Sequence, residues 1–423
     1  MSETVQAKAT HASPQQSELP SGWRWVRLKE VTSVVNGTTP DSENPCFWNG
    51  DIVWITPTDL GKLVEPYIRN SDRRITKAGF DSRNLTRVPS RSVVLSSRAP
   101  IGHLGIAAVE LCTNQGCKSF IPNDDTHEWF LYYALKRSVW KLQQLGSGAT
   151  FAEISKTQLE NFIIPLPPIE EQRRIVGVLR EQMEAVEKAR TAAQARLAAV
   201  KALPAAFLRQ VFPQPGQPLP DGWRWVRLGE IASHGPDNGI FKRRGDFGRG
   251  VAIVNVSDLY RSLHVDLSLT ERVCVTADEL KRYEIVPGDL FFCRSSLKRE
   301  GIGWCCVIKE MEEPAVFECH VMRVRLKLTD AIPEHVARYW QHPAVREKVI
   351  GNSRTATMTT MNQQDLSGVM IPLPPLPEQR RMAGVLKEQM AAGEKARAAA
   401  EEELATINAL PAALVRRAFS GDL

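Results

Sequence analysis

The sequence predicts two α/β (α+β) domains separated by two long helices, in a pseudo-two-fold duplicated architecture. Three observations carry this prediction. A 49-residue segment occurs twice without gaps, at Ile164–Phe212 and at Ile371–Phe419. A shorter segment, LPSGWRWVRLKEV at Leu19–Val31, returns as LPDGWRWVRLGEI at Leu219–Ile231. With 423 residues the chain also exceeds what one hydrophobic core usually organises.

The composition is that of an ordinary globular protein, with 43% hydrophobic and 24% charged residues. A net charge of +6 permits nucleic-acid binding, but many unrelated proteins are as basic. No apolar run approaches the roughly 18–20 residues that span a bilayer. Residues 1–18 are polar and lack the apolar stretch of a signal peptide, so we expect a disordered leader and a cytoplasmic location.

The eight cysteines are scattered and form no CxxC pair. Cys305, Cys306, Cys319 and His320 are the one conceivable metal cluster, but adjacent cysteines suit a tetrahedral site poorly. The alternation in GIGWCCVI is typical of a buried strand. We therefore expect reduced core thiols and no metal site.

The first domain is expected at residues 19–162. The period of two in GWRWVRL predicts a strand at its entrance, and the tryptophans there fit a core edge better than a platform for bases. Further short apolar runs predict strands at Asp51–Ile55, Ser92–Ser97 and Ile101–Val109. Helical spacing of apolar residues predicts one helix over Thr126–Leu145.

The second domain is expected at residues 221–369, after a Pro-rich linker at 213–220. Its rhythm is the same although its residues differ. The corresponding helix is predicted over Glu334–Ile350, with Tyr339-Trp340 at the place of Tyr132-Tyr133.

The repeated segments predict long helices at residues 163–212 and 370–423, each entered through a Pro-Pro pair. Apolar residues recur at steps of three and four, which indicates a coiled-coil seam rich in alanine. Pro204 and Pro411 are expected to kink or end helices of about 35 residues and roughly 50 Å. Because both copies lie in one chain, an intramolecular antiparallel coiled coil is favoured over pairing in a homodimer.

Catalytic motifs are missing together: no P-loop, dinucleotide fingerprint, HExxH or acidic nuclease cluster stands out, nor the Asn/Asp-Pro-Pro-aromatic motif of adenine methyltransferases. Basic and small polar residues gather in both domains instead, where they can neutralise phosphates and read base edges. A solvated charged face is the alternative for any single residue. The candidate DNA-binding residues are Thr38, Thr39, Trp48, Arg69, Arg73, Arg74, Lys77, Ser96, Ser97, Arg98, Lys242, Arg243, Arg244, Arg294, Ser295, Ser296, Lys298 and Arg299.

The pattern resembles the specificity (S) subunit of Type I restriction–modification systems. The entries LPSGWRWVRLKEV and LPDGWRWVRLGEI and the segments IPLPPIEEQRRI and IPLPPLPEQRRM carry the resemblance. GTTPDSENPCFWNGDIVWITPTDL (Gly37–Leu60) and SSRAPIGHLGIA (Ser96–Ala107) add to it. In the first copy, Glu170 departs from the Pro377-Glu378 pattern of the second.

The resemblance implies a non-catalytic subunit whose two target-recognition domains read the halves of an asymmetric, bipartite double-stranded DNA site. It implies two methyltransferase (M) subunits that carry S-adenosylmethionine, and restriction (R) subunits that use ATP and Mg. It also implies that the helices set the half-site spacing and dock the M subunits. The implied M-subunit contacts are Pro165, Leu166, Pro168, Glu171, Gln172, Arg173, Pro372, Leu373, Pro375, Glu378, Gln379 and Arg380.

Two other classes stay open. A stand-alone DNA-binding scaffold of another phage-defence assembly would lack a methyltransferase partner. A self-contained enzyme would transfer methyl groups or cleave DNA by itself.

Overall fold

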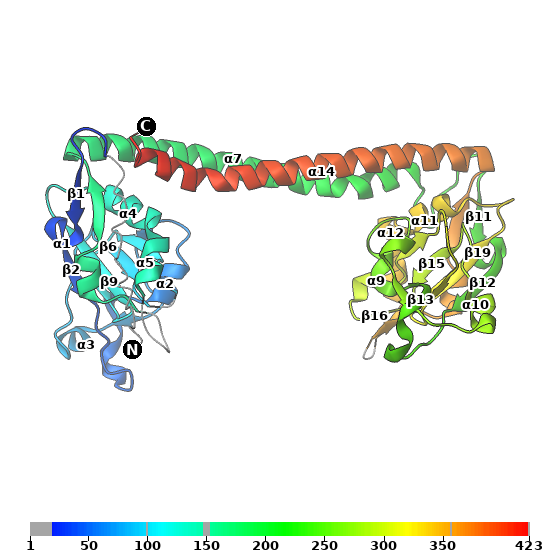
Figure 1. Cartoon of the computed structure of the whole chain (residues 1–423), viewed down its shortest axis with the longest axis horizontal. Coiled ribbons are helices and arrows are strands. Elements are labelled where there is room, and N and C mark those ends of the chain that lie inside the picture. The colour runs from blue at the N-terminus through cyan, green and yellow to red at the C-terminus, as the bar shows by residue number, and fades with distance from the viewer. Residues whose placement is uncertain (1–18, 99, 147–152, 356–357, 422–423) are drawn as a thin grey trace, which may run out of the picture. The chain divides into compact units, whose positions relative to one another are not determined.

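The computed structural model describes residues 19–98, 100–146, 153–355 and 358–421, so the expected leader at residues 1–18 lies outside the described part (Figure 1). The chain divides into two compact units. Unit 1 comprises Met1–Ala192 and Leu404–Leu423, and unit 2 comprises Ala193–Glu403. Each unit therefore takes a part of both long helices.

Unit 1 is an α/β domain built on a five-stranded sheet of order β2-β9-β6-β7-β4, with a smaller sheet β5-β3-β8 beside it. Helix α4 packs its apolar face into the core that the large sheet forms, with Phe130 and Leu131 fully buried. The strands and helices are β1 (Arg24–Arg27), α1 (Leu28–Val31), β2 (Thr32–Asn36), η1 (Pro45–Phe47), β3 (Trp48–Ile55), α2 (Pro57–Gly61), β4 (Tyr67–Ile68), β5 (Arg74–Ile75), α3 (Lys77–Asp81), β6 (Val93–Ser96), β7 (Leu104–Ala107), β8 (Cys112–Thr113), β9 (Cys117–Pro122), α4 (Glu128–Arg137), α5 (Val139–Leu145), α6 (Lys156–Glu160) and β10 (Ile163–Leu166).

Unit 2 repeats this topology with different residues. The sheet β12-β19-β15-β17 corresponds to β2-β9-β6-β7, and β14-β13-β18 corresponds to β5-β3-β8. A further small sheet has the order β16-β21-β20. The elements are β11 (Arg224–Arg227), α8 (Leu228–Ile231), β12 (Ala232–Asn238), η2 (Arg244–Asp246), β13 (Phe247–Val254), α9 (Val256–Leu259), η3 (Leu267–Leu269), β14 (Glu271–Val273), α10 (Ala277–Tyr283), β15 (Leu290–Cys293), β16 (Ser295–Ser296), η4 (Arg299–Gly301), β17 (Cys305–Val307), β18 (Ala315–Phe317), β19 (Val321–Leu326), α11 (Pro333–Trp340), α12 (Pro343–Asn352), β20 (Arg354–Thr355), β21 (Thr359–Thr360), α13 (Gln363–Ser367) and β22 (Met370–Leu373).

The two kinds of sequence repeat pair with each other. In unit 1, β1 and β10 form an antiparallel ladder in which Trp25 lies opposite Pro165. In unit 2, β11 and β22 form the same ladder, with Trp225 opposite Pro372. The tryptophan-rich entrance and the IPLPP segment therefore recur together because each is the hydrogen-bonding partner of the other.

The glutamines of the two EQRR segments tie each long helix to its domain. Gln172 is fully buried, and its amide nitrogen donates to the carbonyls of Asp125 (2.8 Å) and Pro167 (2.9 Å) while its oxygen accepts from the His127 N–H (2.8 Å). Gln379 makes the same three bonds in unit 2, to Asp330, Pro374 and Ile332. Buried amides that satisfy buried backbone groups in this way are costly to remove.

The long helices α7 (Ile169–Val211) and α14 (Leu376–Ala418) contain 43 residues each. The expectation of about 35 residues is wrong, because Pro204 and Pro411 lie inside the helices rather than ending them. At 1.5 Å per residue each helix is about 65 Å long.

The helices pair antiparallel within this chain. In unit 1 the beginning of α7, with Ile175 and Leu179, shares a core with the end of α14, where Val415 and Ala418 are buried. In unit 2, Leu208 near the end of α7 packs in the core that contains Met382 and Leu386 of α14. Since one end of each helix meets the opposite end of the other, the predicted intramolecular antiparallel coiled coil is confirmed.

Two single helices predicted from the sequence are each a pair of shorter helices. Ser138 separates α4 from α5, and its hydroxyl donates to the Ala134 carbonyl (2.8 Å), a local bond that competes with helical pairing. In unit 2, Pro343 begins α12 and thereby separates it from α11. In the described residues, no helix is long and apolar enough to cross a membrane.

Candidate nucleic-acid interface

The serine–arginine tripeptides predicted to bind DNA follow equivalent strands in the two units. Ser96-Ser97-Arg98 lies at the end of β6 and Arg294-Ser295-Ser296 follows β15. Each tripeptide is held by the loop that precedes the neighbouring strand. The Ser97 N–H donates to the Gly116 carbonyl (2.8 Å), and the Arg294 N–H donates to the His320 carbonyl (2.7 Å). The fold thus brings both tripeptides to the same place in their domains.

The four serines of these tripeptides are buried. Ser96 Oγ accepts from the N–H groups of Gly102 (3.1 Å) and His103 (2.8 Å), which closes the loop between β6 and β7. Ser97 donates to the Gly116 carbonyl (3.2 Å), and Ser296 accepts from the Lys298 N–H (3.2 Å). Their side chains therefore organise the loop ends through internal hydrogen bonds.

In unit 1, Arg73 is the cation that is best placed on an aromatic surface. Its guanidinium lies 3.5 Å from the centre of the Trp48 ring and 5.9 Å from that of Trp54. Trp48 is itself buried, donates to the Asp41 carbonyl (3.1 Å) and meets Trp54 edge to face. The tryptophan therefore supports Arg73 by a cation–π contact rather than presenting its own face to a ligand.

The other unit 1 cations are fixed by neighbours. Arg69 pairs with Glu65 (3.1 Å), Lys77 with Asp81 (3.5 Å) and Arg98 with Glu153 (2.9 Å). Arg74 donates twice to Asn70 Oδ1. Exposed ion pairs of this kind are weak, so a phosphate can replace the carboxylate at little cost.

Thr38 and Thr39 follow β2 and meet the loop between β8 and β9. The Thr38 N–H donates to the Thr113 carbonyl (2.8 Å), and the Thr39 hydroxyl contacts the Gln115 side chain. Gln115 is exposed and belongs to the loop that also holds Ser97. It is a candidate base-reading residue that the sequence argument missed, because no local pattern reveals which loops meet.

In unit 2, Arg243, Arg244, Lys298 and Arg299 are exposed, whereas Lys242 is largely buried in an ion pair with Glu279 (2.7 Å). Arg294 lies partly buried, with its guanidinium donating to the Cys319 carbonyl (3.2 Å). Lys298 borders a cavity of about 740 Å³.

Apolar and aromatic side chains line that cavity, among them Tyr260, Leu297, Trp304 and Met358. Leu297 is 83% exposed, although it lies between buried Ser296 and basic Lys298. An exposed leucine beside cations in a strand-end loop suits contact with an apolar base edge such as the thymine methyl group. Sequence reasoning missed it because a lone leucine in a polar segment is normally assigned to the core.

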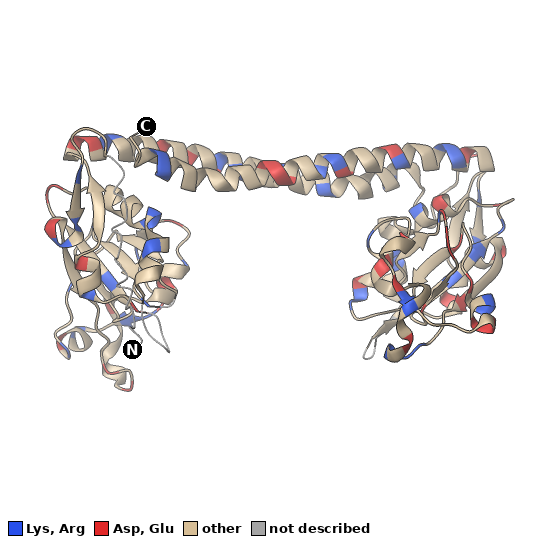
Figure 2. Cartoon of the chain, viewed as in Figure 1, with Lys and Arg blue, Asp and Glu red and all other residues tan. Residues whose placement is uncertain are grey.

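Charges of both signs are interspersed on each domain rather than gathered in one uniform patch (Figure 2).

A lysine with a lowered pKa lies close to the first tripeptide. Burial lowers the pKa of the Lys118 ammonium, and the carboxylate of Glu153 opposes this shift from 3.5 Å. Glu153 therefore joins Lys118 to Arg98 as one charged group.

The residues predicted to contact M subunits divide into buried and exposed sets. Buried inside this chain are Pro165, Leu166, Gln172, Pro372, Leu373 and Gln379. The side chains of the two glutamines form hydrogen bonds to the backbone of their own domain, so they attach the helix to the domain within this chain. Facing outward, in whole or in part, are Pro168, Glu171, Arg173, Pro375, Glu378 and Arg380.

The eight cysteines are free thiols in the described residues. Cys305 and Cys306 lie in the core on β17, where burial raises the pKa of both thiols, and Cys306 Sγ lies 2.7 Å from the Leu259 carbonyl oxygen. Cys305 and Cys306 are therefore core residues, whereas Cys319 and His320 are partly exposed.

Comparison with known proteins favours one of the classes left open above. Residues 20–193 match the family model described as the Type I restriction modification DNA specificity domain. The MjaIX Type I specificity subunit of Methanocaldococcus jannaschii is 37% identical over 164 residues, which is 38% of either chain. The EcoKI specificity subunit of Escherichia coli K12 is 22% identical over 96% of this chain and 90% of that one. Residues 20–193 thus match the Type I specificity-domain family, and the chain as a whole is similar to Type I specificity subunits.

Solved structures show the same fold for the whole specificity subunit. One chain, from work on complex assembly and conformational transition of the type I R-M system, has a TM-score of 0.75 at 24% identity, covering 96% of this chain and 100% of that chain. The HsdS subunit of Thermoanaerobacter tengcongensis has a TM-score of 0.66 at 24% identity, covering 97% and 99%. This chain thus shares its duplicated two-domain, two-helix fold with both solved chains.

Proposed function

We propose that this specificity subunit binds an asymmetric, bipartite site on double-stranded DNA, with one domain on each half-site. The observation that carries the proposal is the contrast within the chain. The elements that attach each domain to the helices are nearly identical, whereas the strand-end loops differ in almost every residue. Equal attachments with unequal loops fit two different half-sites at a fixed spacing.

In unit 1, the reading surface is proposed to include Arg73, Arg98 and Gln115; in unit 2, it includes Arg294, Leu297 and Lys298. The guanidinium groups suit phosphate or guanine, the glutamine suits adenine, and the leucine suits a thymine methyl group. Neighbouring carboxylates such as Glu65 and Asp81 would release their cations to phosphates when DNA binds. Affinity would therefore fall steeply with salt.

The subunit is proposed to act without catalytic residues of its own, in the cytoplasm. Two M subunits would bring S-adenosylmethionine for adenine N6 methylation, and R subunits would bring ATP and Mg for cleavage. Because the target adenine has to be extruded into an M-subunit pocket, this chain would only need to position the duplex. The exposed ends of the helix entrances, with Pro168 and Pro375, are the proposed docking points.

Exchange of Ala232–Val369 for the same segment of another family member tests the modular assignment. The exchange keeps β11, β22 and Gln379, and thus the attachment of the domain. Methylome sequencing of cells that express the chimera with its M subunit should show a change in one half-site only. The reciprocal exchange of Thr32–Phe162 should change only the other half. A change in both half-sites, or in neither, would contradict the proposal.

Co-purification distinguishes the proposed function from the alternative of a stand-alone DNA-binding scaffold. A stand-alone phage-defence scaffold would bind DNA but would not co-purify with a methyltransferase that bears the Asn/Asp-Pro-Pro-aromatic motif. Methyl transfer by this chain alone would instead support a self-contained enzyme.

A further inference from the structure

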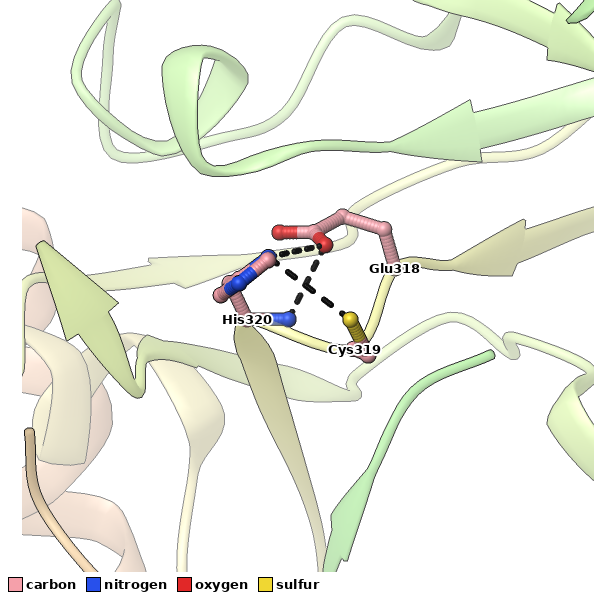
Figure 3. A group of neighbouring side chains, drawn as sticks. All are labelled: Glu318, Cys319 and His320. Carbon is pink, nitrogen blue, oxygen red and sulfur yellow. Dashed lines mark hydrogen bonds and ion pairs between the residues drawn. The ribbon is translucent and has the colours of Figure 1, made fainter. Parts of the chain in front are cut away.

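A compact group of metal-ligating side chains lies in the loop between β18 and β19 of unit 2. Glu318, Cys319 and His320 follow one another in the chain and turn their donor atoms toward one another (Figure 3). His320 Nδ1 lies 2.8 Å from Glu318 Oε2 and 3.6 Å from Cys319 Sγ. All three donor atoms lie within 4.8 Å of one another.

These distances suit one tetrahedral zinc ion. With Zn–S near 2.3 Å and Zn–N near 2.05 Å, a sulfur and a nitrogen ligand stand about 3.6 Å apart at the tetrahedral angle. The Cys319–His320 separation already has this value. The His320–Glu318 pair would open by about half an ångström to admit the ion, since nitrogen and oxygen ligands stand about 3.3 Å apart.

The group is reachable from solvent. Glu318 and His320 line the 740 Å³ cavity beside Tyr260 and Leu297, which leaves a fourth coordination position for water. The Glu318 carboxylate and a Cys319 thiolate would supply two negative charges. One positive charge lies nearby, because the Arg294 guanidinium donates to the Cys319 carbonyl.

The turn alone does not account for these residue types. Glu318 Oε2 accepts from the His320 N–H (2.9 Å), which closes the turn. In unit 1 the corresponding loop is Asn114-Gln115-Gly116, and Asn114 Oδ1 closes it by accepting from the Gly116 N–H (3.0 Å). The turn therefore requires one acceptor at its first position. The turn itself needs no thiol at its second position, and the imidazole at its third position adds a contact to Glu318 (2.8 Å).

We propose that Glu318, Cys319 and His320 bind a zinc ion that braces the base-reading segment of unit 2. The link to that segment is direct, because the His320 carbonyl accepts from the N–H groups of Arg294 (2.7 Å) and Ser295 (3.3 Å). Coordination of the imidazole fixes the residue whose carbonyl holds the strand end. The effect on DNA reading rests on the proposed function, whereas metal binding does not.

Metal binding is tested on the full-length chain without DNA. Zinc affinity is measured by competition with a chromophoric chelator, and cobalt(II) substitution reports thiolate ligation through a near-ultraviolet charge-transfer band. One ion per chain is expected, and Cys319→Ser or His320→Gln should weaken zinc binding by more than about tenfold. Cys274→Ser is the matched control, since Cys274 is a partly exposed thiol elsewhere in unit 2.

A graft of the unit 1 loop separates metal loss from misfolding. The triple variant Glu318→Asn, Cys319→Gln, His320→Gly keeps the acceptor that closes the turn, and should fold but bind no zinc. Zinc affinity unchanged in Cys319→Ser and His320→Gln, or no stoichiometric zinc binding by the native chain, would overturn the site. If zinc binds as expected but its removal leaves recognition of both half-sites unchanged, the bracing role is overturned and the metal site stands.

Discussion

The two units share their attachment to the long helices and differ at their far ends. Trp25 opposite Pro165 and Trp225 opposite Pro372 are the same ladder, and Gln172 and Gln379 make the same three bonds. At the strand-end loops, Asn114-Gln115-Gly116 stands where Glu318-Cys319-His320 stands. The repeated residues thus hold each domain on the helices, and the divergent residues are the ones proposed to contact DNA.

The largest effect is predicted for substitutions that remove the glutamine attaching each domain to its long helix. Gln172→Leu removes three hydrogen bonds, one to the buried Pro167 carbonyl and two to partly buried backbone groups, which should cost unit 1 about 3 kcal/mol. Gln379→Leu should cost unit 2 the same. Hydrogen exchange measured by mass spectrometry on the β1/β10 and β11/β22 peptides reports the two units separately. Each variant should lose stability in its own unit only, and by the same amount. A loss of stability in one variant alone would contradict the equivalence of Gln172 and Gln379.

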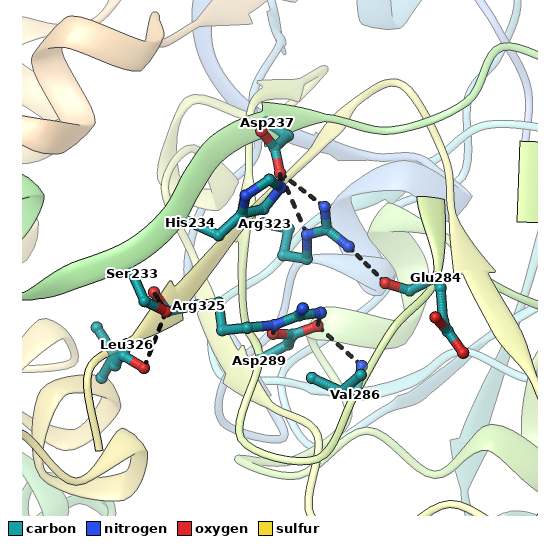
Figure 4. Close-up of polar contacts among 9 residues, drawn as sticks. All are labelled: Ser233, His234, Asp237, Glu284, Val286, Asp289, Arg323, Arg325 and Leu326. Atoms are coloured by element: carbon teal, nitrogen blue, oxygen red, sulfur yellow. Dashed lines mark hydrogen bonds and ion pairs between the residues drawn. The ribbon is translucent and has the colours of Figure 1, made fainter. Parts of the chain in front are cut away.

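The next effect is confined to unit 2, because a carboxylate is fully buried immediately before its strand β15. Arg325 on β19 donates to both oxygens of Asp289 (2.7 and 2.9 Å), and Arg323 donates to Asp237 (Figure 4). Asp289 is fully buried and also accepts from the Val286 N–H (2.9 Å). In unit 1, the residue before the corresponding strand is Ser92, whose hydroxyl finds no hydrogen-bond partner among the described residues.

Asp289→Ala should therefore destabilise unit 2 by about 3 kcal/mol, because it leaves the partly buried Arg325 without its counter-ion. Ser92→Ala is the matched control and should change unit 1 by less than about 0.5 kcal/mol. The same hydrogen-exchange measurement checks both. If Asp289→Ala is as mild as Ser92→Ala, the ion pairs are not what distinguishes the two sheets.

The periodicity and the repeats were enough to predict the fold class, the two domains and the coiled coil. They failed at Ser138 and Pro343, where local bonding divides a periodic segment into two helices, and at Pro204, where packing carries the helix through a proline. The resemblance placed Gln172 among the M-subunit contacts, whereas its side chain is buried inside this chain. A polar residue in a charged segment is indistinguishable by pattern from one whose amide closes a buried backbone junction.

The candidate site was predictable only in outline, as two clusters of basic and polar residues. Which loops meet depends on strand pairing between distant segments, so the contact of Gln115 with Thr39 did not follow from spacing. Sequence alignment of the repeats also placed Tyr339-Trp340 opposite Tyr132-Tyr133. The glutamine bonds show that His127 corresponds to Ile332, and this register puts His335 at the place of Phe130.

That substitution makes the smallest predicted difference between the units, and it depends on pH. Phe130 packs on Phe419 with tilted rings (4.8 Å between ring centres), and His335 packs edge to face on Phe212 (5.2 Å). Burial lowers the pKa of His335 to about 4. An unfolded histidine binds a proton near pH 6.5, so the folded state loses stability as pH falls from about 6.5 toward 4 and keeps it fully above that range.

His335→Phe should remove this acid sensitivity, so that acidification from pH 7 to pH 5 costs unit 2 about 2 kcal/mol less than in the native chain. At neutral pH the variant loses the contact of Nε2 with the Pro372 carbonyl (3.0 Å), worth about 1 kcal/mol. Unit-resolved hydrogen exchange at several pH values gives the slope. His342 remains in both proteins, so the difference isolates His335. Phe130→His should introduce the same slope into unit 1, and parallel slopes for native and variant chains would show that His335 is not the residue that titrates.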